Sequence, residues 1–223
     1  MKKVFLPFLL LAAIAFTACE NGPKDGTEAK VTNAKAVAQN NANGTVYVID
    51  TNAGNFKWEG HKIGKSHHGD IHLQSGQVFI SDNKITGGNF VMDMNSINDI
   101  DLKGKDDAMQ SKLITHLKSD EFFDVAKYPT ANFEITSVKD SSAGDNNTWV
   151  EGNLTIKGKT QNIGFPAKID VDENKATAKA KVIIDRSKFD VRYGSKNFFA
   201  DLAGDKIISN DITLDIDFVA NKQ

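Results

Sequence analysis

The segment DITLDIDF, residues 211–218, alternates polar and apolar residues without interruption along its whole length. Successive side chains of a β-strand point to opposite faces, so the apolar residues at even positions share one face and the polar residues share the other. This period of two is typical of a strand with one buried and one solvated face. The segment therefore predicts a strand that lines an apolar interior, with Leu214 and Phe218 on the buried face.

The same alternation recurs upstream, in runs separated by short stretches rich in Gly, Asn and Asp. Such stretches favour turns, because these residues tolerate the backbone angles that tight turns need. Many short strands with short connections predict antiparallel pairing in an all-β barrel or sandwich. The apolar positions of these runs are Phe56 and Trp58; Phe90, Met92 and Met94; Ala131, Phe133 and Ile135; Val150, Leu154 and Ile156; Ile163, Phe165, Ala167 and Ile169; and Ala178, Ala180, Val182 and Ile184.

One segment interrupts the β pattern. Residues 106–118 place Met109, Leu113 and Leu117 four positions apart, which is the spacing of one face of an α-helix. Asp106 or Asp107 is a suitable N-cap, since its carboxylate can accept a hydrogen bond from a free backbone N–H of the first turn. The sequence therefore predicts a single amphipathic helix inserted between strands.

The first eighteen residues have the pattern of a cleavable signal peptide. Lys2 and Lys3 supply its positive start, and residues 5–16 form its apolar stretch. That stretch is too short to cross a bilayer as a helix, which takes roughly 20 residues. The sequence FTAC at 16–19 resembles a bacterial lipobox, in which the cysteine is acylated and becomes the mature N-terminus.

Cys19 is the only cysteine of the sequence, and acylation explains why an exported protein keeps one unpaired thiol. A covalent lipid anchors a protein to a membrane with ~0.8 kcal/mol per buried methylene. Residues 19–44 are polar and predict a flexible tether. The sequence thus divides into a signal peptide at 1–18, a lipidated tether at 19–44 and one β domain at 45–223. We expect the protein on the periplasmic or outer-membrane face of the bacterial envelope.

Three motifs follow one another along the β domain: HLKSDEFFDV with KYPTANF at 116–133, GNLTIKG at 152–158, and IDRS at 184–187 followed by Phe189. Their order and spacing resemble those of the YceI-like family, which comprises lipocalin-like, polyisoprenoid-binding periplasmic proteins. The similarity runs over about residues 46–219. The resemblance implies an antiparallel barrel of about eight strands, with a helix at its mouth and an elongated apolar cavity for a polyprenyl chain.

The resemblance further implies binding, sequestration or transport of an isoprenoid-type lipid, either a polyprenyl chain or a quinone. Such a ligand needs no catalytic group and no cofactor, since burying its hydrocarbon gains ~25 cal/mol per Å². The residues that we expect to line the cavity are Phe56, Trp58, Phe90, Met92, Met94, Phe133, Ile135, Leu154, Ile156, Phe165, Ala178, Ala180, Val182, Leu214 and Phe218.

Alternation alone does not distinguish a hollow barrel from a filled one, because both bury the apolar face. Eight strands enclose just enough space to be filled by side chains or to hold one small ligand. The small side chains of Ala178 and Ala180, and the adaptable Met92 and Met94, favour a cavity. The alternative is a filled barrel that acts through protein contacts, and the domain could also form a homodimer.

Arg186 and Arg192 are the only arginines of the sequence. A guanidinium group suits bidentate recognition of a phosphate or a carboxylate better than an ammonium group does. Both residues are therefore candidates for binding the polar head of the lipid. In the alternative interpretation, Arg186 pairs with Asp185 or another acid and braces the end of a strand.

His61, His67, His68 and His72 fall within twelve residues. Imidazoles at this density can bind zinc or copper, and a hairpin could bring the first and the last together. A metal-binding or stress-responsive envelope protein is therefore the alternative function. Against it, only Asp70 lies nearby as a carboxylate partner, and an exposed loop uses histidine simply as a polar residue.

Other functional classes find little support in the sequence. A formal net charge of −2 offers no basic face for nucleic acid. The sequence has no serine in a strained, glycine-flanked turn, no second cysteine and no Gly-rich phosphate loop after a strand. It therefore indicates a binding protein rather than an enzyme.

Overall fold

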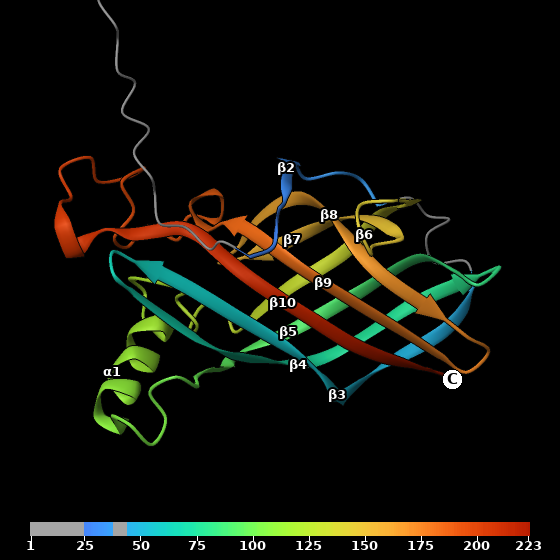
Figure 1. Ribbon diagram of the computed structural model, residues 1–223, viewed down its shortest axis with the longest axis horizontal. Helices are drawn as coiled ribbons and strands as arrows, with labels where there is room; N and C mark the ends of the chain where they lie inside the picture. The colour runs from blue at the N-terminus through green and yellow to red at the C-terminus, as the bar shows by residue number, and fades with distance from the viewer. Residues whose placement is uncertain (1–24, 38–43) are drawn as a thin grey trace, which may run out of the picture.

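The strands of this protein close into an antiparallel barrel, with a helix at one end and the C-terminus at the other (Figure 1). The computed structural model describes residues 25–37 and 44–223. Within these residues the barrel has eight strands, β3 to β10, which confirms the predicted all-β barrel with one inserted helix. The elements are β1 (Thr27–Glu28), β2 (Lys30–Asn33), β3 (Thr45–Lys62), β4 (Lys65–Ser81), β5 (Lys84–Asp99), α1 (Asp107–Lys118), β6 (Thr130–Asp140), β7 (Thr148–Ile156), β8 (Lys159–Val171), β9 (Lys175–Asp185) and β10 (Ile208–Lys222), with 3-10 turns at Arg186–Phe189 and Gly204–Lys206.

Hairpins build the barrel, and tight turns set their register. Between β4 and β5, Asp82 and Asn83 both adopt left-handed backbone angles, with φ of 52° and 58°. Two such residues in succession are typical of a type I′ turn, whose twist matches that of the strands it joins. The decisive segment 211–218 lies in the middle of β10, which pairs with both β9 and β3. Leu214 is buried there and Asp215 is exposed, as the alternation predicts.

The barrel closes between β8 and β9, which pair only near their shared hairpin. Farther along, residues 27–33 fill the gap between the two strands: β1 runs parallel to β9 and β2 runs antiparallel to β8. The Ala29 N–H donates to the Ile183 carbonyl at 2.8 Å. Ala29 and Val31 pack against the core of the barrel. We call residues 27–33 the seam segment.

Within residues 25–37, the described part of the predicted tether 19–44, the docked seam segment corrects the prediction of flexibility. Lys181 contacts Asp25 at 2.6 Å, and Lys35 forms an ion pair with Glu151, so side chains on both flanks hold the segment in place. Sequence reasoning missed this docking because the segment is polar and short. Its partners are the free backbone groups at the edges of β8 and β9. The pattern of side chains along a sequence does not predict which backbone groups stay free.

Helix α1 agrees closely with the predicted segment 106–118. The Asp106 carboxylate caps its start by accepting a hydrogen bond from the Met109 N–H at 3.0 Å. Leu117 is buried and Leu113 is half-buried, whereas Met109 remains exposed. The apolar face that the helix presents to the barrel is therefore shorter than the sequence suggests.

The predicted signal peptide and Cys19 lie outside the described residues. Among the residues that are described, we find no helix with both the length and the hydropathy needed to cross a membrane.

Candidate functional site

Two adjoining cavities lie inside the barrel in the part of the chain that the structure describes. Cavity 1 has a volume of about 150 Å³, and cavity 2 has a volume of about 80 Å³. Phe56, Met92, Leu154 and Leu214 line both, so these side chains form the partition between them. The interior is therefore hollow on either side of this partition rather than filled throughout.

Cavity 2 is bordered only by hydrocarbon. Phe90 lies between Phe218 and Phe133, with ring centroids 5.1 and 6.2 Å away, and these rings line one wall. Ile169 and Ala178, which face each other across the β8–β9 pair, line it as well. Cavity 2 thus lies toward the end of the barrel that carries the β8–β9 hairpin.

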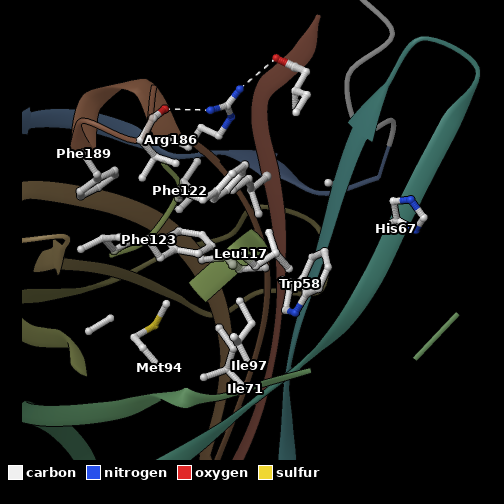
Figure 2. Close-up of a pocket in the computed structure, with 18 of the residues that line it drawn as sticks. Trp58, His67, Ile71, Met94, Ile97, Leu117, Phe122, Phe123, Arg186 and Phe189 are labelled. Atoms are coloured by element: carbon white, nitrogen blue, oxygen red, sulfur yellow. Dashed lines mark hydrogen bonds between the residues drawn. The ribbon is translucent and has the colours of Figure 1, made fainter. Parts of the chain in front are cut away.

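Cavity 1 lies toward the opposite end, where the β3–β4 hairpin and α1 meet. Leu117 of α1 and the neighbouring Phe122 and Phe123 cover its apolar side, facing Trp58 (Figure 2). Its border also contains polar residues of the β3–β4 hairpin, namely His61, Lys62, Lys65 and His67. The two cavities together therefore form an apolar interior, and charged side chains border it at one end only.

Arg186 places a buried positive charge at this polar end. The side chain is 2% exposed and lines cavity 1. Its guanidinium donates to the backbone carbonyls of Val191 at 2.8 Å, Ser209 at 2.9 Å and Ile208 at 3.1 Å (Figure 2). Ile208 pairs with Lys62 of the β3–β4 hairpin, which locates Arg186 at the same end as the lysines.

Burial lowers the pKa of Arg186 to about 10, against the opposing effect of Asp185, so the group stays charged at neutral pH. Among the described residues, no carboxylate forms an ion pair with it. Its positive charge is instead stabilised by carbonyl dipoles and by the ring of Phe122, whose centroid lies 5.5 Å from the guanidinium carbon.

A family model described as "YceI-like domain" matches residues 47–220. The chain belongs to the YceI-like family. This confirms the resemblance that the sequence motifs indicate, and the match covers nearly all of the barrel from β3 to β10.

Curated relatives match this YceI-like chain over a shorter stretch. The UPF0312 protein of Shewanella denitrificans is 42% identical over 52 residues, which are 23% of this chain and 26% of that protein. The UPF0312 protein of Pseudomonas putida is 48% identical over 52 residues, with the same shares. The matched stretch thus spans about a quarter of the length of these relatives.

Solved structures share the YceI-like fold. The crystal structure of Burkholderia cenocepacia BcnA matches with a TM-score of 0.60 and 20% identity, over 77% of this chain and 99% of that one. A domain from Saccharophagus degradans, described as a polyisoprenoid binding domain implicated in plant cell wall breakdown, matches with a TM-score of 0.54 and 15% identity. That match covers 80% of this chain and 99% of the other. At these identities the likeness establishes the fold.

Most of the residues expected from the sequence to contact a ligand border the interior of this YceI-like barrel. Ala180 and Val182 border neither cavity; Val182 is completely buried, and Ala180 is partly buried. The expected residues that line cavity 1 or cavity 2 are Phe56, Trp58, Phe90, Met92, Met94, Phe133, Ile135, Leu154, Ile156, Phe165, Ala178, Leu214 and Phe218.

Sequence reasoning missed the lining residues that lie outside the alternating runs. Leu113 and Leu117 come from α1, and Phe122 and Phe123 come from the turns that follow it. The paired aromatic residues 122–123 were a usable signal, since two large apolar side chains directly after a helix need an apolar surface to cover. Their place at the cavity follows from how α1 packs on the barrel, which periodicity does not show.

The two arginines differ in their relation to the site. Arg192 donates to Asp190 at 2.6 Å, stacks near the ring of Phe198 and borders neither cavity, so its predicted contact with a lipid head finds no support in the geometry. Arg186 does border cavity 1, yet it braces backbone carbonyls rather than the acid that the alternative interpretation assigned to it.

The four neighbouring histidines do not converge on one point. His68 and His72 are exposed and lie on the face of β4 opposite to His67, because side chains alternate along the strand. His61 contacts Glu59 at 3.5 Å. Within the described residues, the group able to hold a metal ion combines His67 with Asp99 and Asp101 instead. The four histidines of the alternative function are therefore not brought together into one metal site in the described part of the chain.

Proposed function

We propose that this YceI-like barrel binds one amphiphile of the isoprenoid type. The hydrocarbon chain occupies cavities 1 and 2, and the polar head lies at the end that carries Arg186. The observation that supports this proposal is the position of the cationic residues: cavity 2 is bordered by apolar residues, whereas Lys62, Lys65 and Arg186 border cavity 1. A ligand that matches this pattern has a long apolar body and one anionic or strongly polar end.

The class of ligand is further supported by the shared fold. The Saccharophagus degradans domain carries the description of a polyisoprenoid binding domain and matches over 80% of this chain. Methyl-branched isoprene units suit walls of Phe, Met and Leu, because these side chains offer a hydrocarbon surface. The shape of the cavities then determines how the chain is oriented. Each buried methylene contributes about 0.8 kcal/mol, so a few isoprene units suffice for tight binding.

The volumes of the cavities bear on the length of the ligand. An apolar cavity of about 150 Å³ holds a molecule the size of benzene. A chain of several isoprene units therefore fills both cavities and displaces the side chains of the partition. Met92, an unbranched and adaptable side chain, can move aside at low cost. We expect the ligand to open the partition and convert the two cavities into one tube.

Mass spectrometry of the full chain, purified in mild detergent, tests the proposal directly. We expect a stoichiometric adduct that is released on unfolding and carries repeated isoprene units. A chain that stays free of ligand after incubation with quinones and with polyprenyl phosphates contradicts the proposal.

A matched pair of variants on β10 tests the place of binding. Leu214 belongs to the partition, and Asp215 points away from the interior. Leu214→Trp fills the passage and should reduce the yield of long-chain adduct at least 10-fold, whereas Asp215→Trp should leave it unchanged. Equal adduct in both variants contradicts binding across the partition. Thermal unfolding of each variant checks that the barrel has formed.

The head group is tested with a pair of ligands. An isoprenoid phosphate and the corresponding alcohol differ only in charge, so the phosphate should bind more tightly if cations of cavity 1 contact it. Lys62→Gln and Lys65→Gln should weaken binding of the phosphate and leave the alcohol unaffected. Lys179→Gln, on the outer side of β9, serves as the control.

We further propose that Cys19 is acylated and holds the barrel close to a membrane of the bacterial envelope. The seam segment supports this placement, because docking begins by Thr27, which lies only eight positions after Cys19. Eight residues span at most about 28 Å when fully extended. Labelling of cells with an alkyne fatty acid should mark the chain, and Cys19→Ser should abolish both the label and the membrane association.

A further inference from the structure

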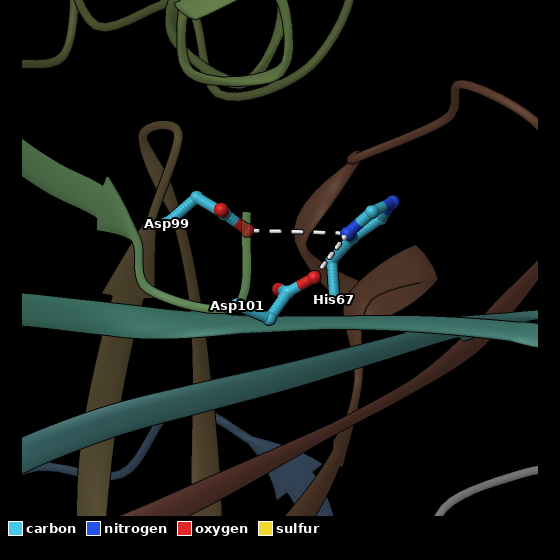
Figure 3. A group of neighbouring side chains, drawn as sticks. All are labelled: His67, Asp99 and Asp101. Atoms are coloured by element: carbon cyan, nitrogen blue, oxygen red, sulfur yellow. Dashed lines mark hydrogen bonds and ion pairs between the residues drawn. The ribbon is translucent and has the colours of Figure 1, made fainter. Parts of the chain in front are cut away.

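His67, Asp99 and Asp101 meet beside cavity 1, in a cluster that the lipid-binding proposal does not use (Figure 3). The imidazole comes from β4, Asp99 ends β5, and Asp101 lies two residues beyond that end. His67 Nδ1 lies 3.1 Å from Asp101 Oδ2 and 3.9 Å from Asp99 Oδ2. One donor atom from each of the three residues lies within 4.8 Å of the others.

Backbone groups orient both carboxylates toward the imidazole. The Leu102 N–H donates to Asp99 Oδ1 at 3.0 Å, and the His68 N–H donates to Asp101 Oδ1 at 2.9 Å. Each carboxylate thus has one oxygen held by a backbone amide and presents the other to His67 Nδ1. Fixed outer contacts of this kind orient the ligands of protein metal sites and tune the affinity for the ion.

Asp99 supplies the independent sign that a cation belongs here. Its side chain is completely buried, and its Oδ2 atom accepts no hydrogen bond from any described residue. That atom is the one turned toward His67 and Asp101 (Figure 3). Burying a carboxylate oxygen without a donor costs free energy, which a bound cation would offset.

We propose that His67, Asp99 and Asp101 bind one divalent transition-metal ion of the zinc type. Two ligand atoms that are each about 2.0–2.2 Å from one ion lie roughly 3 to 4.3 Å apart, and both distances from His67 Nδ1 fall in this range. An imidazole nitrogen among the ligands favours a transition metal over calcium or magnesium, which prefer oxygen ligands alone.

The site keeps open coordination positions. Three protein ligands leave at least one position of a tetrahedral ion for water or another small ligand. His67 is partly exposed and borders cavity 1, so the open side is accessible from the solvent and from the polar end of the barrel. The proposal concerns the ion alone and holds whether or not the barrel binds a lipid.

Titration calorimetry with Zn²⁺ tests the site on the full chain after its metals have been removed with a chelator. We expect one ion per chain. His67→Gln and Asp101→Asn should each weaken binding by roughly 100-fold, and both positions are exposed enough for the variants to fold. Co²⁺ in place of Zn²⁺ should give a visible absorption spectrum that is lost in His67→Gln.

His72→Gln is the matched control, because His72 lies on the same strand but points away from the cluster. It should bind Zn²⁺ like the unaltered chain. Absence of saturable binding at millimolar Zn²⁺, or equal binding by His67→Gln and the unaltered chain, overturns the proposal. Loss of binding in His72→Gln overturns it too, because the ion would then sit elsewhere on the histidine-rich hairpin.

Discussion

Arg186 and Arg192 stand six residues apart in opposite environments. Arg186 is buried and donates to three backbone carbonyls, whereas Arg192 is exposed and contacts Asp190. A buried carbonyl that loses its donor costs about 1–3 kcal/mol. An exposed ion pair contributes roughly 0–1 kcal/mol. The same residue type therefore contributes more to the free energy of unfolding at position 186 than at position 192.

The arginine pair gives a prediction at the scale of single residues. Arg186→Leu should lower the free energy of unfolding by about 3–5 kcal/mol, because it leaves buried carbonyls without a donor. Arg192→Leu should change it by less than about 1 kcal/mol. Urea unfolding followed by tryptophan fluorescence measures both values. Similar values for the two variants would show that Arg186 is not the brace that the geometry indicates.

At the scale of elements, the seam segment covers backbone groups that would otherwise be exposed along β8 and β9. A free strand edge is prone to pair with other chains. Deletion of residues 25–37 should therefore lower the melting temperature and promote aggregation. Faster hydrogen exchange should appear at Ile163 and Ile183, whose strands pair with the segment. Unchanged exchange at these positions would mean that the seam segment does not protect the edges.

Docking of the seam segment should depend on pH. The hydrogen bond from Lys35, which outweighs the opposing effect of burial, lowers the pKa of Glu151 below its ordinary 4.5. The stabilisation of the docked segment by this ion pair is then complete above pH 4.5. It is lost as the pH falls through the lowered pKa of Glu151. The hydrogen bond to Asp25 raises the pKa of Lys181 above 10.5, so that contact is complete below pH 10.5 and is lost at higher pH.

We therefore expect acid to weaken the docking of the seam segment. The free energy of docking should fall by no more than about 1 kcal/mol, because Lys35 is partly exposed. The NMR signals of the Ala29 and Val31 amides, followed from pH 7 to pH 3, should shift with an apparent pKa below 4.5. Lys35→Met should remove most of this shift. A shift that persists in Lys35→Met would assign the pH dependence to another group.

At the scale of the whole molecule, the barrel encloses two adjoining cavities. A ligand that binds only the folded barrel stabilises it by about 2.7 kcal/mol at a concentration of 100 times its Kd. For a domain of this size, 1 kcal/mol raises the melting temperature by about 2–4 °C. A bound isoprenoid should therefore raise the melting temperature by about 5–10 °C. A long-chain ligand should raise the melting temperature of Leu214→Trp by less than that of the unaltered chain. An equal rise in both would contradict binding across the partition.

The sequence determined the strands and the family. The alternation in residues 211–218 requires one buried face, and the motif at 116–133 contains both the end of α1 and the turns that follow it. These features are local, because side-chain direction in a strand and capping of a helix depend on residues close along the chain. They predicted the barrel and the helix, and most of the residues that we expected to line the cavity border cavity 1 or cavity 2.

The tertiary structure alone decided three other features. Whether the inward side chains fill the barrel depends on how side chains from opposite walls pack against one another. Met92 and Leu214 belong to the partition that this packing forms between the two cavities. The seam segment docks through backbone groups of β8 and β9, which side-chain patterns do not encode. His67 reaches Asp99 and Asp101 because β4 pairs with β5. Such contacts depend on the register between distant segments, and the order of residues along one segment does not reveal that register.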